Sequence, residues 1–134
     1  MALLTDLFVA NEADAKSYDA ASARRFSAAQ FSGLTNLEFE TLWAILLGEE
    51  WEGEKHALTP IAETESTWTF RFPPQYVLRL TQTTPREAAA AAAAWAATEE
   101  ISADASDVAP IITTLIALAK SVQPSRGLFV WTAL

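Results

Sequence analysis

The chain has 134 residues, a formal net charge of −8 and no cysteine. This length predicts one domain, 1–134, with enough chain to bury a conventional core. The missing cysteine excludes disulfides, thiolate metal sites and a cysteine nucleophile, and it fits the reducing cytoplasm, where we expect the protein to be. No apolar run approaches the roughly 20 residues that span a bilayer, and no signal peptide is recognisable, so no membrane association is expected.

The negative charge is unevenly distributed. Residues 1–67 hold twelve acidic and four basic side chains, whereas residues 68–134 hold five of each. The window 38–65 contains eight glutamates and one basic residue, Lys55. Charge of this sign repels phosphate backbones and attracts cations, so nucleic acid is not an expected partner. The cluster is either a solvated surface that keeps the protein soluble or a surface for a basic partner.

The first 32 residues predict one strand and one short helix. Apolar residues occupy both alternating faces of 3–10, which is typical of a buried strand. Asn11 then has the features of an N-cap, with acidic residues in the turn that follows, so a helix is expected from Glu12 to about Ala20. Residues 22–32 are mixed in composition and are expected to form a connection.

The next segment carries the strongest helix signal. Thr35 and Glu38 form a capping-box pattern, and Gly48 is a typical residue just beyond a helix end, so the helix is expected to end at Leu47. It has two apolar stripes. The first contains Leu34, Leu37, Thr41, Leu42, Ile45 and Leu46, and the second contains Phe39, Trp43 and Leu47. Two stripes favour a helix sandwiched in the core, and the alternative is a second stripe that contacts a partner.

The remaining elements follow an acidic, irregular segment over 49–67. Clean alternation predicts a strand over 67–72, buried on one face. Three helices are then expected, over 75–82, from a cap at Thr84 to about Glu100, and from a cap at Ser106 to about Val122. The last segment, 127–133, is apolar on both faces and predicts a central strand.

These elements predict an α+β domain. Its sheet is expected to be small, mixed or antiparallel, with about three strands over 3–10, 67–72 and 127–133. About four to five helices are expected to cover one face of the sheet or both. The C-terminal strand is expected in the middle of the sheet.

The sequence contains no recognised catalytic motif. Its single histidine, His56, lies among glutamates without a partner nucleophile, and we interpret it as a surface residue. The carboxylates between Glu49 and Glu65 lack the spacing of a calcium loop, and the four glycines form no phosphate-binding loop. We therefore expect neither a metal nor a cofactor.

The leading functional hypothesis is an acidic protein-interaction module, either an inhibitor or immunity-type protein or an adaptor, that binds a basic protein. The predicted patch consists of Trp43, Glu49, Glu50, Trp51, Glu52 and Glu54. Acidic residues accelerate encounter with a cationic partner, and an aromatic anchor prolongs the complex. Two alternatives remain. One is a small enzyme whose site is assembled in space from acids and Arg71 or Arg79, and the other is a structural homodimer formed through Phe39, Trp43 and Leu47.

Overall fold

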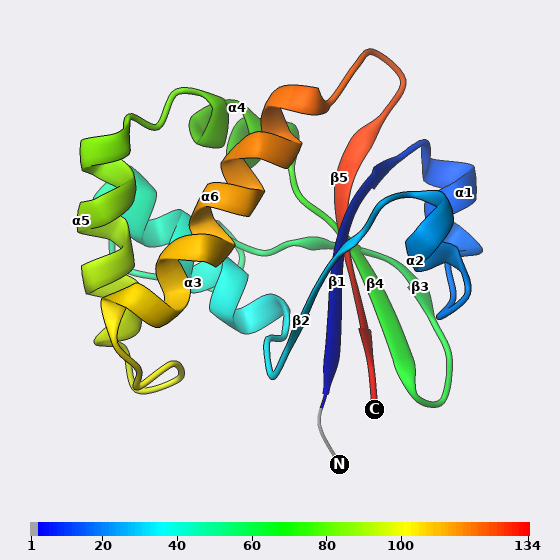
Figure 1. Cartoon of the computed structure of the whole chain (residues 1–134), viewed down its shortest axis with the longest axis horizontal. Coiled ribbons are helices and arrows are strands. Elements are labelled where there is room, and N and C mark those ends of the chain that lie inside the picture. The colour runs from blue at the N-terminus through cyan, green and yellow to red at the C-terminus, as the bar shows by residue number, and fades with distance from the viewer. Residues whose placement is uncertain (1–2) are drawn as a thin grey trace.

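The computed structural model describes residues 3–134, and within this range six helices and five strands form an α+β fold. The strands are β1 (Leu4–Ala10), β2 (Ala29–Ser32), β3 (Thr59–Glu63), β4 (Thr67–Arg71) and β5 (Gly127–Ala133). They form one antiparallel sheet in the order β2-β1-β5-β4-β3. Figure 1 shows the sheet in the middle of the molecule with helices on both sides.

The C-terminal strand lies at the centre of the sheet, as its sequence predicted. β5 pairs along its whole length with β1, from Gly127 opposite Ala10 to Ala133 opposite Leu4. It pairs on its other side with β4. All seven residues of β5 are buried, which explains why both of its faces are apolar.

The prediction of about three strands was wrong, because β2 and β3 also join the sheet in the described part of the chain. Both are edge strands. β2 has only four residues, and it follows a short helix within the segment expected to be a connection. β3 contains Pro60, which lacks a backbone donor, and its register with β4 shifts between Pro60 and Ala62.

Two short helices cover one face of the sheet, and four longer helices cover the other (Figure 1). The short helices are α1 (Glu12–Lys16) and α2 (Ser22–Arg25). The longer ones are α3 (Asn36–Leu47), α4 (Pro74–Thr81), α5 (Pro85–Ala96) and α6 (Ala105–Ser121). Among residues 3–134, no helix has both the length and the hydropathy needed to cross a membrane.

The helix starts agree with the sequence more closely than the helix ends. Thr35 and Thr84 form the expected capping boxes, and Gly48 adopts the left-handed conformation with φ of 69° at the end of α3. The first helix ends at Lys16 and not near Ala20, and the hydroxyl of the next residue, a serine, donates to carbonyls of the last turn.

The two later helices also differ from expectation at one boundary. α5 ends at Ala96 and not near Glu100, and the Thr98 hydroxyl donates to the carbonyl of Trp95 at 2.7 Å just beyond this end. α6 is capped by Asp104 and not by Ser106, since Asp104 forms a capping box with the acidic residue three positions later.

The face of the sheet covered by α3–α6, here called the helical face, carries the larger core. Leu7, Leu128 and Val130 of the sheet pack there against α3–α6. The helices contribute mainly Phe39, Trp43, Tyr76, Leu80, Trp95, Ile112 and Leu115. This core fixes α3 against the sheet, and it thereby sets the position of the loop that follows α3.

The opposite face, here called the aromatic face, has a smaller core in which all the large buried side chains are aromatic. Phe8 stacks on Tyr18 with ring centroids 4.0 Å apart, and it also contacts Phe129 at 5.6 Å. Beneath these rings lies the buried carboxylate of Asp6, which accepts a hydrogen bond from the Tyr18 hydroxyl at 2.7 Å. Burial, and then this hydrogen bond, raises the pKa of Tyr18 far above its usual value.

Candidate functional site

The segment after α3, residues 49–56, is here called the Trp51 loop. It leaves the helix at Gly48, and the backbone N–H of Glu49 still donates to the carbonyl of Ala44 at 2.9 Å. Such a bond back into the last helical turn fixes the direction in which the chain leaves the helix.

The buried side chain of His56 stabilises the Trp51 loop by hydrogen bonds. Its backbone N–H donates to the Glu52 carbonyl at 3.0 Å, and its Nδ1 accepts from the Glu52 backbone N–H at 2.9 Å. Because Nδ1 is an acceptor here, the ring proton lies on Nε2 and points to Glu49 Oε1, 3.2 Å away. The interpretation of His56 as a surface residue was wrong, since the side chain is fully buried against the ring edge of Trp43.

Glu49, which is exposed, stabilises the same loop from the solvent side. Its carboxylate accepts from Lys55 Nζ at 2.6 Å in addition to its contact with His56. The hydrogen bond from Lys55, followed by that from His56, lowers the pKa of Glu49, and the same carboxylate raises the pKa of Lys55. Glu49 therefore has internal partners, and it contributes less free charge to the surface than its neighbours.

Trp51 is exposed at the tip of this closed loop, with 47% of its surface accessible. Its ring lies over Gly53, where an added β-carbon would sit 3.6 Å from the ring. On its other side the ring borders a cavity of about 180 Å³ lined by Leu37, Thr41, Trp51 and Glu100. A large apolar side chain is thus presented beside a small recess on a hydrogen-bonded loop.

Several carboxylates lie close to Trp51 in the same loop, and one lines the recess. Glu50, Glu52 and Glu54 are exposed, and none of them forms an ion pair within the described residues 3–134. Glu100 lines the recess itself. Glu38 and Glu40, which belong to the same acidic window, serve the fold instead: Glu38 closes the cap of α3, and buried Glu40 accepts from the Leu58 backbone N–H at 3.1 Å. Three of the unpaired glutamates of this window therefore lie in the Trp51 loop, and the other two, Glu63 and Glu65, lie at the turn between β3 and β4.

The structure does not bring Trp43 to this surface. Trp43 is only 8% exposed and stacks on Tyr76 with centroids 5.0 Å apart, so its inclusion in the predicted patch needs correction. Phe39 is fully buried as well, and of the stripe Phe39, Trp43 and Leu47 only Leu47 is exposed. The stripe is sandwiched against α4 and α5, and it offers no continuous surface through which a homodimer would form.

Sequence reasoning missed Leu37 as a surface residue. It was assigned to a core stripe, but it lies in the first turn of α3 and is 53% exposed. Thr41 follows Leu37 by one helical turn, and both residues line the recess beside Trp51. The exposure of Leu37 could have been predicted from its position, because side chains in the first turn of a capped helix often extend past the core.

The two arginines of the alternative enzyme site lie on opposite faces of the sheet. Arg71 lies 3.6 Å from Glu12 of α1, on the aromatic face. Arg79 instead donates to the Leu46 carbonyl at 3.0 Å and to Glu87 at 2.9 Å, joining three helices on the helical face. Among residues 3–134, no group of three or more His, Cys, Asp or Glu side chains is placed to hold a metal ion.

Comparison of the chain with protein-family models, with curated proteins and with solved structures found no significant match. The functional argument therefore depends on the Trp51 loop and its surroundings.

Proposed function

We propose that this protein is an interaction module that binds a basic protein partner through Glu50, Trp51, Glu52 and Glu54. The observation that carries the proposal is the half-exposed Trp51 ring beside an apolar recess, among carboxylates without ion-pair partners in residues 3–134. Unpaired surface charge accelerates association with an oppositely charged protein. A tryptophan at the centre of a contact surface is a frequent hot spot of binding energy.

The architecture of the loop supports this role. His56 and Glu49 make hydrogen bonds that close the loop before any partner arrives. A loop that is already ordered loses less conformational entropy on binding, which favours affinity. Neither residue is itself needed as a contact, so their place in the proposal is to position Trp51. An inhibitor or immunity-type protein, or an adaptor, uses a surface of this kind.

The test compares the tagged full chain with a double variant, Trp51→Ala with Glu50→Lys, in pull-downs from the source cells at low and at moderate salt. We expect a basic protein to be captured by the wild type, less at moderate salt, and to be lost with the double variant. With the purified partner, Trp51→Ala alone is expected to lower affinity by about 30-fold.

Glu65→Lys is the matched control, because it makes the same change in net charge at an exposed position between β3 and β4. It is expected to retain the partner. Retention of every partner by the double variant would contradict the proposal. A loss with Glu65→Lys equal to that of the double variant would also contradict it, since binding would then depend on total charge alone.

A further inference from the structure

A second, larger recess lies where the sheet extends beyond its helical cover. The start of the described chain and the end of β5 lie at the same end of the sheet, below α3 in Figure 1. Here the helical face holds a cavity of about 480 Å³. It is lined by Leu3, Thr35, Asn36, Leu37, Trp68, Phe70, Thr132 and Leu134. Four segments that are distant in the sequence therefore meet around one hollow.

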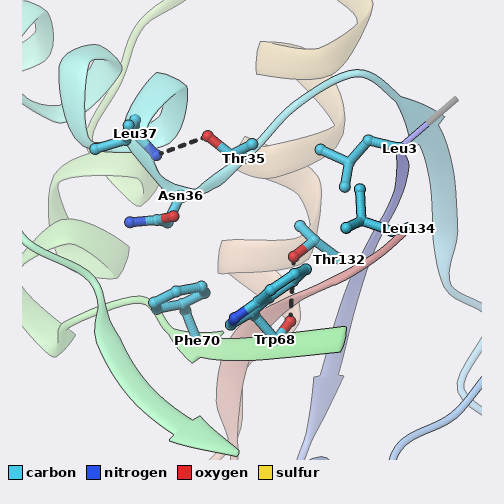
Figure 2. A pocket seen from close by; sticks show the side chains of 8 residues that line it. All are labelled: Leu3, Thr35, Asn36, Leu37, Trp68, Phe70, Thr132 and Leu134. Atoms are coloured by element: carbon cyan, nitrogen blue, oxygen red, sulfur yellow. Dashed lines mark hydrogen bonds between the residues drawn. The ribbon is translucent and has the colours of Figure 1, made fainter. Parts of the chain in front are cut away.

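The walls of this cavity are mainly apolar. Figure 2 shows the rings of Trp68 and Phe70 side by side on β4, with Leu37 across from them and Leu134 on the remaining side. Leu37 and Leu134 are 53% and 62% exposed, so large apolar surfaces face solvent at the rim. Small-molecule sites have this composition, and their volumes run from about 300 to 1,000 Å³.

Polar groups at the cavity are few, and some of them are free to pair with a ligand. The Asn36 amide nitrogen donates to Glu40 at 3.0 Å, while its oxygen accepts no hydrogen bond from a side chain within residues 3–134. The indole N–H of Trp68 likewise has no hydrogen-bond partner in the described part of the chain. The hydroxyls of Thr35 and Thr132 are already engaged. Asn36 also keeps a second amide N–H, and the Thr132 hydroxyl oxygen can still accept, so the cavity offers both donors and acceptors.

The charges in and around the cavity favour an uncharged ligand. The side chains of all eight lining residues, which belong to the described range, are uncharged. An anion would enter a molecule of net charge −8 without finding a cationic partner in the cavity. A cation would leave water for a lining whose side chains are mainly apolar and include no carboxylate, and such desolvation is costly. The same net charge on a second copy of the chain opposes self-association through this surface.

The geometry points to a binding site for a small uncharged organic molecule that has a flat ring and a hydrogen-bonding group such as a hydroxyl. The ring stacks on Trp68 and Phe70, and the polar group reaches the Asn36 amide oxygen or the Trp68 N–H. This site is distinct from the Trp51 recess, although Leu37 contributes to the walls of both. The inference does not depend on the proposed function.

The test uses three probes of similar shape, 2-naphthol, 2-naphthoate and 2-naphthylmethylamine, with the ¹⁵N-labelled full chain. The indole N–H signals are followed by NMR, and Trp68→Phe identifies the signal of Trp68. We expect 2-naphthol to shift this signal saturably and both charged probes to bind at least about tenfold more weakly. Trp51→Ala is expected to leave 2-naphthol binding unchanged, which separates this inference from the proposed function.

Leu134→Arg places a charged side chain at the rim of the cavity, and Leu4→Arg is the matched control. Leu4 is 48% exposed, but its alternation with Leu3 along β1 places it on the opposite face of the sheet. Leu134→Arg is expected to weaken 2-naphthol binding by at least about tenfold, and Leu4→Arg to leave it intact.

Four results would overturn the inference. The first is a Trp68 signal that does not saturate with 2-naphthol, and the second is binding of 2-naphthoate as tight as that of 2-naphthol. The third is an equal loss of binding in both arginine variants. The fourth is self-association that Leu134→Arg abolishes, which would assign the cavity to a second copy of the chain.

Discussion

The two faces of the sheet each bury one of the two tyrosines, and the two hydroxyl groups meet different partners. On the helical face, Tyr76 donates to the Phe39 carbonyl at 2.6 Å. On the aromatic face, Tyr18 donates to the Asp6 carboxylate at 2.7 Å. A carbonyl inside α3 also accepts from the helix backbone. Asp6 receives only one further side-chain hydrogen bond in the described residues, from Gln30 at 3.4 Å.

This difference shows that equal burial does not imply an equal role. The helical face derives its stability mainly from apolar packing, and the Tyr76 hydroxyl is one more satisfied group within it. The aromatic face surrounds a buried carboxylate that needs donors from the protein itself. The same residue type therefore fills space on one face and stabilises a charged group on the other.

The largest expected effect tests the helical face. Trp95 is fully buried, and its indole N–H donates to the Glu38 carbonyl at 2.9 Å. Trp95→Ala is expected to lower the free energy of unfolding by about 3–5 kcal/mol, because it removes packing and leaves a cavity. Urea denaturation followed by circular dichroism measures this. A loss below about 1 kcal/mol would show that this core does not dominate stability.

A middle effect tests the contrast between the tyrosines directly. Tyr18→Phe is expected to lower the free energy of unfolding by about 1.5–3 kcal/mol, since it leaves the Asp6 carboxylate poorly paired. Tyr76→Phe is the matched variant and is expected to cost about 0.5–1.5 kcal/mol, because its partner carbonyl keeps a helical bond. Equal losses in the two variants would remove the distinction between the faces.

The smallest expected effect is a loss of stability that appears only in alkaline solution. The pKa of both tyrosines is raised in the folded chain, for each of them mainly through burial. A raised folded pKa stabilises the fold below the unfolded value of about 10, and this contribution is lost as the pH rises beyond it. We expect the free energy of unfolding to fall above that pH and tyrosinate absorbance to appear together with unfolding. Tyrosinate that forms before unfolding would contradict this.

The sequence predicted the elements whose signals are local. Alternation and apolar runs located β1, β4 and β5, and side-chain caps located the starts of α3 and α5. The central place of β5 was also predictable, because a strand that is apolar on both faces needs neighbours on both sides.

The edge strands and the loop depended on information that the sequence carries weakly. β2 alternates over only four residues, and β3 includes Pro60, which reads locally as a strand breaker. His56 lies among charged residues, yet it is buried because two backbone bonds with Glu52 fold the loop around it. The recess beside Trp51 includes Glu100, almost fifty positions away, and no local pattern reports such a meeting.

The central position of β5 has a consequence for biosynthesis. Leu4 pairs with Ala133, so β1 finds its main partner only after residues 127–133 have been made. Until residues 127–133 leave the ribosome, β1 and β4 have no strand between them, and their inner edges stay open to other chains. Contacts at such sequence separation also slow folding. Chains in which β5 has not yet paired are therefore exposed to aggregation through these two edges.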